Sequence, residues 1–369
     1  MATRILALVG DAYGARGGIA RYNRDLFASL AGAGAEILVL PRIVDEEAVA
    51  VPAGVRQAAA RYGKVRYALD AVWSGWRFRP FDVVFCGHVF MAPLAVLLSR
   101  MLGARCWLQA HGIDVWSGRR DAVRRAIEAA DQVTTVSRAT RKRLLEWVDL
   151  PPERVRVLPN TVDERFSPGP PSDVLRRRLG LGSGPVLLTV GRLANSELYK
   201  GHELVFSALP ELRRRFPGLV HVVAGDGDDR PRLERRAAEL AGDPQAVRFL
   251  GYVPDEELPD LYRLADLFVM PSSDEGFGIV YLEAAACGLR VLGGIGGGSA
   301  DAVPDGRVGA LVDPSDRAGF VEATARLLGM GRVDPSLIEA YRRPHFMAAA
   351  ARLLDRLLAQ PRRASGSAP

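Results

Sequence analysis

The sequence is poor in cysteine and has no long hydrophobic segment. Its three cysteines, Cys86, Cys106 and Cys287, each lie inside an apolar run, and none belongs to a CxxC pair. This pattern argues against a disulfide framework and a zinc site, and it predicts reduced core thiols in a cytoplasmic protein. The apolar run at the N-terminus is far too short to span a bilayer and lacks the layout of a signal peptide, so we expect a first strand there.

The length and composition favour a globular protein with two domains. A chain of 369 residues is long for one hydrophobic core, and its contents of 48% hydrophobic and 25% charged residues are ordinary for a folded protein. Only the segment 361–369, PRRASGSAP, has nothing to pack, and it is predicted to be a disordered tail.

The net charge of +6 is unevenly placed along the chain. Residues 1–178 hold 27 Lys and Arg against 18 Asp and Glu, about +9, whereas residues 179–369 hold 22 against 25, about −3. A basic N-terminal half suits an anionic partner such as a phospholipid surface, a phosphorylated acceptor or nucleic acid. A merely solvated basic surface accounts for the charge equally well.

Short apolar runs alternate with helical patterns from beginning to end, which predicts an α/β protein with parallel sheets covered by helices. The predicted strands are residues 4–10, 36–41, 83–87, 105–110, 133–137 and 154–160 in the first half, and 185–191, 219–225, 247–251, 267–271 and 290–294 in the second. We expect two similar domains, at 1–165 and 185–334, joined by a linker rich in Pro and Gly at 166–184. A last helix at 335–360 has an apolar stripe and could cross back to the N-terminal domain.

The first predicted strand runs into a glycine-rich loop, VGDAYGARGGIARYN at 9–23. Gly14, Gly17 and Gly18 would let the backbone approach a ligand, and the helix that follows offers N–H groups that favour an anion. The spacing differs from the dinucleotide fingerprint, so an NAD site has weak support. A tight strand-to-helix turn alone would explain one glycine better than three.

Two cations follow the first strand of the second half, in GRLANSELYKGH at 191–202. Arg192 lies where a strand ends, at the edge where open α/β sheets bind ligands, and Lys200 precedes the glycine that opens the next helix. A guanidinium and an ammonium that converge there would hold a diphosphate. Each alone is more often a solvated surface charge. Turns with Asp226 and Gly251 end two further strands at the same predicted edge, although such turns are common.

Two glutamates bracket an apolar stretch in DEGFGIVYLEAAACG at 274–288. Glu275 is predicted on a loop, and Glu283 about 7 Å along a helix that begins near Gly278. A buried carboxylate needs a partner, because an unpaired one costs several kcal/mol. We expect one acid to accept hydrogen bonds from a sugar and the other from a ribose. The alternative is a core glutamate paired with a nearby arginine such as Arg290.

The phosphates of such a ligand would lie between the two acids. The backbone N–H groups of Phe277, Gly278 and Ile279, at the start of the predicted helix, are available to them.

Together these features resemble the large GT-B family of retaining glycosyltransferases, marked by two glutamates separated by seven residues (glycosyltransferase family 4-like, glycosyl transferases group 1). The resemblance covers nearly the whole chain, because GGIARYN, QAHGIDVW, TVSRATRKRL and LPNTVDERFSP precede the linker in the family's order. It implies two Rossmann-like domains facing across a cleft, with the acceptor bound mainly by the N-terminal domain and the nucleotide-sugar donor by the C-terminal one.

The resemblance also implies roles for single residues. Arg192 and Lys200 would bind the donor diphosphate, Glu283 the ribose hydroxyls and Glu275 the transferred sugar. The implied catalytic residues are His111, Glu275, Arg192 and Lys200, and the implied donor-binding residues are Gly17, Gly18, Arg192, Lys200, Asp226, Gly251, Tyr252, Val253, Glu275, Gly276, Phe277, Gly278, Ile279 and Glu283. No cofactor or metal would be required. We do not assign Glu275 as a nucleophile, because this spacing does not show the facing carboxylates of hydrolases.

The sequence departs from the family in two places. Thr161 stands where many relatives have glycine, and the segment 293–306 is unusually rich in glycine. Both could bear on donor choice.

The hypothesis is a retaining glycosyltransferase that moves a hexose-type sugar from a nucleotide diphosphate sugar to a lipid-linked or cell-surface polysaccharide intermediate. The segment 61–80 mixes basic residues with Trp73 and Trp76, which suggests peripheral contact with anionic lipid at the inner face of the cell membrane. A nucleotide-sugar epimerase of the same fold and a non-catalytic nucleotide-sugar-binding protein are the alternatives. Nucleic acid is not an expected partner, because no aromatic-basic platform occurs.

Overall fold

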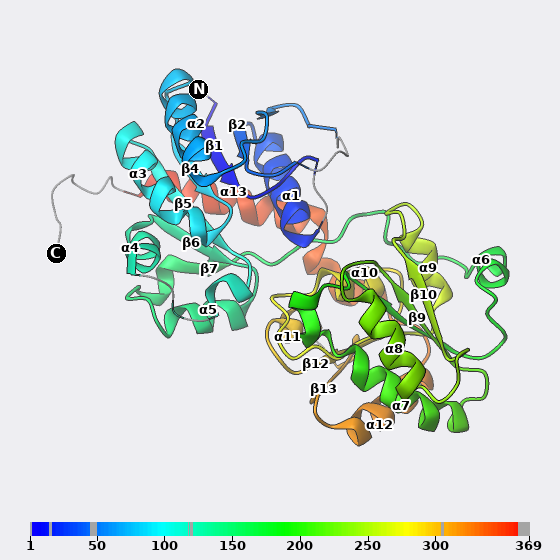
Figure 1. Ribbon diagram of the computed structural model, residues 1–369. Helices are drawn as coiled ribbons and strands as arrows, with labels where there is room; N and C mark the ends of the chain where they lie inside the picture. The colour runs from blue at the N-terminus through cyan, green and yellow to red at the C-terminus, as the bar shows by residue number, and fades with distance from the viewer. Residues whose placement is uncertain are drawn as a thin grey trace. The chain divides into compact units, whose positions relative to one another are not determined.

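A computed structural model describes residues 2–14, 17–44, 50–116, 118, 121–303 and 306–360, which fold into two α/β units (Figure 1). The first unit comprises residues 1–159 and 344–369, and the second residues 160–343. The predicted tail at 361–369 lies outside the described residues. Within them, no helix is both long and apolar enough to cross a bilayer.

The first unit contains a seven-stranded sheet, in which all paired strands are parallel, in the order β3-β2-β1-β4-β5-β6-β7. Its strands are β1 (Arg4–Val9), β2 (Glu36–Pro41), β3 (Val55–Gln57), β4 (Val83–Cys86), β5 (Arg105–Ala110), β6 (Gln132–Thr135) and β7 (Val155–Val157). Its helices are α1 (Gly18–Gly32), α2 (Lys64–Arg77), α3 (Ala92–Leu102), α4 (Asp121–Ala129), α5 (Arg138–Leu145) and α13 (Arg343–Ala359), with 3-10 turns at Val89–Met91, Ile113–Val115 and Pro152–Arg154. All six predicted strands form, and the polar edge strand β3 is additional.

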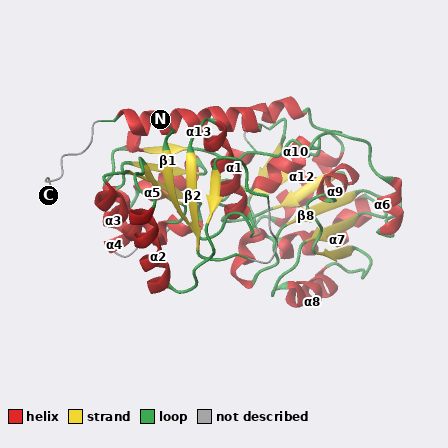
Figure 2. Cartoon of the chain, turned by 90° about the horizontal axis from the view of Figure 1, so that it is seen from above, coloured by secondary structure: helices red, strands yellow, loops and turns green. Residues whose placement is uncertain are grey.

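Alternate residues of the first sheet pack on opposite helical layers (Figure 2). Leu6, Leu8 and Leu108 face a core built with α2, α3, α4 and α5. On the other face, the ring of Phe85 meets those of Phe27 and Trp107 edge-on, at centroid distances of 5.5 and 5.6 Å. Both faces are therefore buried, which explains the nearly continuous apolar runs of these strands.

The second unit repeats this arrangement with six strands, again parallel, in the order β10-β9-β8-β11-β12-β13. Its strands are β8 (Val186–Val190), β9 (Val220–Ala224), β10 (Val247–Gly251), β11 (Leu267–Met270), β12 (Val291–Gly294) and β13 (Gly309–Val312). Its helices are α6 (Asp173–Arg178), α7 (His202–Arg215), α8 (Arg230–Leu240), α9 (Leu258–Leu264), α10 (Ile279–Ala286), α11 (Ser299–Ala302) and α12 (Arg317–Leu328), with 3-10 segments at Asn195–Lys200 and Pro335–Tyr341. The five predicted strands form and β13 is additional.

Helices also cover both faces of the second sheet. Helices α7, α8 and α12 supply the core on one face, with Phe206 and Phe320 fully buried. On the other face, α9 and α10 contribute Tyr262 and Tyr281, whose rings pack against Phe268 at centroid distances of 5.9 and 5.7 Å. The aromatic residues thus fill the space between sheet and helices.

The structure places residues 166–184, expected to be a linker, within the second unit. This segment contains α6, whose N-cap Ser172 accepts a hydrogen bond from the backbone N–H of Leu175 (3.1 Å). The guanidinium of Arg263 on α9 binds the carbonyl of Ser167 (Nε to O, 3.0 Å). The segment that its Pro and Gly content predicted to be a linker therefore contains a short capped helix and is held by side-chain contacts.

The C-terminal helix α13 packs on the first unit. The ring of Phe346 meets Tyr22 edge-on at a centroid distance of 5.8 Å, and the Arg105 guanidinium donates to the carbonyl of Gln360. The preceding segment, Pro335–Tyr341, belongs to the second unit, where the carbonyl of Tyr341 accepts from Thr161 Oγ1 (2.8 Å). The threonine that departs from the family pattern therefore has a structural partner.

Glycines let the loops at the ends of β8 and β9 touch backbone to backbone. Gly225 has φ +142°, and a Cβ there would lie 1.8 Å from the carbonyl oxygen of Gly191. Gly227 has φ +156°, and its Cβ would lie 2.1 Å from the carbonyl oxygen of Leu193. No side chain fits at either position, so this contact sets the shape of the sheet edge.

We therefore expect Gly225→Ala to lower the free energy of unfolding by about 3 kcal/mol or more, because strain and a backbone collision add. Gly180→Ala is the control. Gly180 lies in the same unit with φ +64°, but nothing lies within 4 Å of a built Cβ. The expected loss in the free energy of unfolding is therefore only about 1 kcal/mol. Urea unfolding measures both. Equal losses in the two variants would show that the loops are not in contact.

Candidate active site

The candidate site lies at the carboxyl ends of β8 and β11, where the chain order of the second sheet reverses. Open α/β sheets bind ligands at such a switch point. The loops after the two strands touch, because a Cβ at Gly201 would lie 2.3 Å from the carbonyl oxygen of Pro271. In addition, the backbone N–H of Ser273 donates to the carbonyl of Tyr199 (2.9 Å).

Glu197 holds the two predicted cations together. Its Oε1 pairs with the guanidinium of Arg192, and its Oε2 lies 2.5 Å from Lys200 Nζ. Lys200 Nζ also donates to the backbone carbonyl of Arg192 (2.9 Å). The Arg192 side chain is 71% exposed and that of Lys200 only 9%, so the arginine faces solvent while the lysine is fixed beneath it. A Cβ at Gly191 would lie 2.9 Å from Nζ, so a side chain there would displace the ammonium from this position.

Glu197 was not among the site residues predicted from the sequence. Its signal was available, because it is the only acid between Arg192 and Lys200 and lies three positions before the lysine. The residue has non-helical backbone angles inside the 3-10 segment Asn195–Lys200 (φ −121°), which lets one carboxylate reach both cations.

Glu275 joins this group of charges. It is partly buried, and burial raises the pKa of its carboxyl above the usual value, while Lys200 and Arg192 act to lower it and Glu197 to raise it. The backbone N–H of Gly276 hydrogen-bonds the carboxylate and also acts to lower the pKa. The structure thus brings Glu275 and the two cations together, as predicted.

The helix after Glu275 begins at Ile279, close to the predicted start. Its N-cap Gly278 is left-handed (φ +86°), and no side chain caps the helix. A Cβ at Gly278 would lie 2.4 Å from the ring of Tyr281. Phe277 is buried with its ring 6.1 Å from that of Tyr341, so it anchors the loop.

Glu283 is buried on α10, and its Oε2 accepts a hydrogen bond from the Tyr262 hydroxyl (2.8 Å). The alternative pairing with Arg290 is wrong. Arg290 precedes β12, at the edge of the sheet opposite the strand ends, and its guanidinium donates to the carbonyls of Gly331 (2.7 Å) and Arg307 (2.6 Å). Tyr262 had no sequence signal, since α9 and α10 meet only in the fold. A ribose contact for Glu283 stays a prediction.

The other predicted donor residues lie at the same edge, on the loops after β9 and β10. Asp226 accepts from the backbone N–H of Gly227 (2.9 Å) and pairs loosely with Arg230 (Oδ2 to Nη1, 3.5 Å). Gly251 is left-handed (φ +71°), and its carbonyl accepts from Gly225 N (2.8 Å). Tyr252 and Val253 follow and line a groove with residues of α6 and α9.

Residues 294–298 of the glycine-rich segment pack on the Glu275 loop. A Cβ at Gly294 would lie 2.0 Å from the carbonyl oxygen of Ser272, and one at Gly296 1.7 Å from that of Ser273. The carbonyl of Glu275 accepts from Gly298 N (2.6 Å). Close backbone contact therefore requires glycine at positions 294 and 296.

The remaining predicted residues, His111, Gly17 and Gly18, belong to the first unit. His111 follows β5, and its Nε2 lies 3.1 Å from the carbonyl oxygen of Gly87. Burial, assisted by His88, lowers the pKa of His111 to about 3, so the ring is neutral near pH 7. A neutral ring that donates from Nε2 presents Nδ1 as an acceptor.

Helix α1 begins at Gly18, after the N-cap Gly17 (φ +112°), and no side chain caps it. Among the described residues, nothing lies within 4 Å of a Cβ built at either glycine.

Comparisons with known proteins identify the family. Residues 184–330 match the family described as glycosyl transferases group 1, and residues 16–166 match glycosyltransferase family 4. A Mycobacterium tuberculosis protein named GDP-mannose-dependent alpha-(1-6)-phosphatidylinositol monomannoside mannosyltransferase is 34% identical over 354 residues, covering 88% of this chain and 89% of that protein. The chain belongs to the glycosyl transferases group 1 family. It is a glycosyltransferase that uses a nucleotide sugar.

Other relatives agree with this assignment. The Mycolicibacterium smegmatis protein of the same name is 41% identical over 253 residues, a match that spans 64% of this glycosyltransferase and 65% of the relative. Among solved structures, Anabaena HepE in complex with UDP-glucose has a TM-score of 0.76 at 19% identity, covering 96% of this chain and 99% of that chain. The structural likeness confirms the predicted GT-B fold class.

Two buried histidines lie beneath the cations of this glycosyltransferase. His202 follows Lys200 and Gly201, and burial, with the nearby Lys200, lowers its pKa to about 4. His221 on β9 is fully buried, and burial lowers its pKa to about 3; its Nε2 lies 2.8 Å from Thr189 Oγ1. Both rings are neutral near pH 7, so they add no charge to the site.

The lowered pKa of His221 predicts acid sensitivity. In the unfolded chain this histidine has a pKa near 6.5, whereas in the folded protein its pKa is about 3. Between these two pH values only the unfolded state binds the proton, so the free energy of unfolding decreases as the pH falls through this range. Below pH 6 this histidine should lower the free energy of unfolding by about 1.4 kcal/mol per pH unit, and we expect His221→Leu to remove that contribution. Urea unfolding between pH 7 and pH 4 measures it.

The reference is the unaltered protein, measured over the same pH range. An unaltered slope in the His221 variant would contradict a neutral buried imidazole.

Proposed function

We propose that this glycosyltransferase moves mannose from GDP-mannose, with retention of configuration and without a metal, to a lipid-linked acceptor that carries a phosphorylated inositol. Two relatives carry the name of a GDP-mannose-dependent phosphatidylinositol monomannoside mannosyltransferase. Another, from Acidothermus cellulolyticus, is named D-inositol 3-phosphate glycosyltransferase and is 36% identical over 215 residues, or 56% of this chain and 47% of its own. An inositol bearing phosphate is common to both names.

The observation that carries the proposal is the cluster of Arg192, Lys200 and Glu197. The arginine uses one edge of its guanidinium for Glu197 and stays largely exposed, so it keeps donors for a diphosphate. Lys200 has three N–H groups, of which one donates to the Arg192 carbonyl, and its ammonium also forms an ion pair with Glu197. Positive charge fixed at the leaving group stabilises the negative charge that develops there, and in the proposal this replaces a metal ion.

The acids have separate roles in the proposal. Glu275, beside the cations, accepts hydrogen bonds from hydroxyls of the transferred sugar, while Glu283, oriented by Tyr262, accepts from the ribose. His111 on the first unit offers a neutral acceptor to the donor sugar. In a balanced reaction the bond from the anomeric carbon to the diphosphate oxygen breaks, a bond to the acceptor oxygen forms on the same face, and the proton of the acceptor hydroxyl passes to the departing GDP.

Peripheral membrane contact is the second part of the proposal. Helix α2 exposes Val65, Leu69, Trp73 and Trp76, which are 59–72% exposed and recur at spacings of four, four and three residues. These side chains therefore form one stripe, the α2 stripe, along the helix. Basic residues on the same helix, Lys64, Arg66 and Arg77, would face anionic headgroups. In the proposal, these side chains hold the enzyme at the inner face of the cell membrane, within reach of a lipid acceptor.

We predict that Arg192→Gln lowers mannose transfer from GDP-mannose about 100- to 1,000-fold, because one fixed charge at the leaving group is lost. The fold should persist, because the side chain is 71% exposed. Arg214→Gln, at an exposed arginine of the same unit, is the control. Radiolabelled transfer to phosphatidylinositol mannoside measures activity, and the melting temperature measures folding.

Unchanged transfer in the Arg192 variant would refute the diphosphate role. Incubation of the enzyme with GDP-mannose and no acceptor separates the alternatives: an epimerase interconverts the sugar, and a binding protein leaves it unchanged even when acceptor is added. A rise in melting temperature with UDP-glucose but not with GDP-mannose would overturn the donor assignment.

The α2 stripe generates a membrane prediction. Trp73→Ser with Trp76→Ser should remove most co-sedimentation with vesicles of phosphatidylcholine and phosphatidylglycerol, because two interfacial aromatic anchors are lost. The control carries Val174→Ser with Met330→Ser, two exposed apolar residues of the second unit. Sedimentation that does not depend on anionic lipid, or is equal in both variants, would contradict peripheral attachment through α2.

A further inference from the structure

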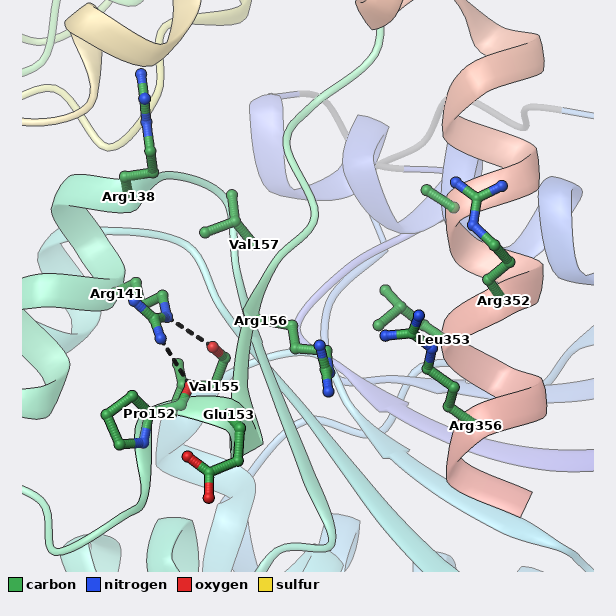
Figure 3. Close-up of a pocket in the computed structure, with 11 residues that line it drawn as sticks. Arg138, Arg141, Pro152, Glu153, Val155, Arg156, Val157, Arg352, Leu353 and Arg356 are labelled. Atoms are coloured by element: carbon green, nitrogen blue, oxygen red, sulfur yellow. Dashed lines mark hydrogen bonds between the residues drawn. The ribbon is translucent and has the colours of Figure 1, made fainter. Parts of the chain in front are cut away.

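A groove of about 420 Å³ runs along β7 in the first unit, between α5 and α13 (Figure 3). Five arginines line it together with one carboxylate: Arg138, Arg141, Arg156, Arg352, Arg356 and Glu153. None of the predicted donor-site residues lies in it. The groove therefore concentrates positive charge at a place that the proposed transfer reaction does not use.

Arg141 is a structural member of this group. Its Nε donates to the carbonyl of Val155 and its Nη2 to that of Pro152, both at 2.7 Å. Strand β7 is an edge of the sheet, and the bond to Val155 occupies one carbonyl of that strand, while Pro152 lies in the preceding 3-10 turn. Arg141 therefore ties α5 to the start of β7, and its guanidinium already has two backbone partners.

Arg156, Arg352 and Arg356 are available to a ligand. None of the three forms an ion pair or hydrogen bond with any residue in the described part of the chain. Arg352 and Arg356 are exposed, four residues apart on one face of α13, and Arg156 stands on β7 across the groove (Figure 3). Like charges four apart on a helix repel each other, so the arrangement is unfavourable unless an anion lies between them.

The remaining groups place the anion within the groove. Glu153 lies beside Pro152 at one end, and its carboxylate would repel a negative ligand there (Figure 3). The open cationic end lies between Arg156 and α13, over a floor that includes Leu353 and Val157. Guanidinium groups bind the oxygens of a phosphate in pairs, and the volume admits a phosphate together with a small polar body.

We propose that Arg156, Arg352 and Arg356 form a binding site for a phosphate group, carried either by a soluble phosphorylated compound or by the headgroup of an anionic phospholipid. This site is separate from the donor diphosphate site. It goes beyond the proposed transfer reaction, because it would hold even if the donor were another nucleotide sugar.

The test compares the intact chain with a triple variant, Arg156→Ser, Arg352→Ser and Arg356→Ser. The control removes the same charge at three exposed arginines elsewhere, by Arg125→Ser, Arg214→Ser and Arg235→Ser. Equilibrium dialysis with radiolabelled inorganic phosphate counts bound phosphate per chain. We expect the triple variant to lose on the order of one equivalent that the control keeps, with any phosphate at the donor site retained in both.

A second arm uses vesicles of phosphatidylcholine with and without phosphatidylglycerol. A lipid source predicts that the triple variant, unlike the control, loses sedimentation with anionic vesicles, and a soluble source predicts a loss in dialysis alone. Unchanged melting temperature without ligand shows that the variants fold. Equal phosphate binding and equal sedimentation for the triple variant and the control would overturn the proposal.

Discussion

The site depends on one carboxylate that holds two cations at the end of a parallel strand. Glu197 pairs with Arg192 and Lys200, and Lys200 also binds the arginine's own carbonyl, so three residues fix one another. A lysine buried without such a partner would be strongly destabilising, because a lone charge is costly in the interior. The pairing therefore allows a nearly buried ammonium at the floor of the site while the guanidinium stays open to a ligand.

The glycines around this cluster help to keep its charged residues in position. Gly191 leaves room for the lysine, and Gly225, Gly294 and Gly296 let neighbouring loops meet through their backbones. Direct contact between backbones leaves little room for a loop to shift, so the charges that it carries keep their positions. Such positioning before a ligand arrives lowers the cost of reorganisation during the reaction.

Most of the parallel strands could be predicted from the sequence because they are buried on both faces and form continuous apolar runs, whereas the edge strands β7 and β10 are only partly buried. Strand β3 was not predicted, because its residues, VRQ, are mostly polar and lie at a sheet edge. Strand β13 was not predicted, because it is short and begins with Gly309. A Cβ at that glycine would lie 1.9 Å from the carbonyl oxygen of Val291. Neither shows the periodicity on which the prediction relied.

The site was predictable to the extent that its residues follow strands directly. Arg192, Lys200 and Glu275 could be placed at one edge, because carboxyl ends of parallel strands share it. The partner of Glu283 could not be found, because Tyr262 comes from another helix and only packing brings the two together.

The central claim is that the cluster around Glu197 receives the donor diphosphate. The most direct test is a crystal structure of the enzyme with bound GDP. We predict that phosphate oxygens lie within hydrogen-bond distance of the Arg192 guanidinium and of Lys200 Nζ, with Glu197 still in contact with both. A diphosphate bound at another place, with Arg192 and Lys200 left on Glu197 alone, would contradict the account.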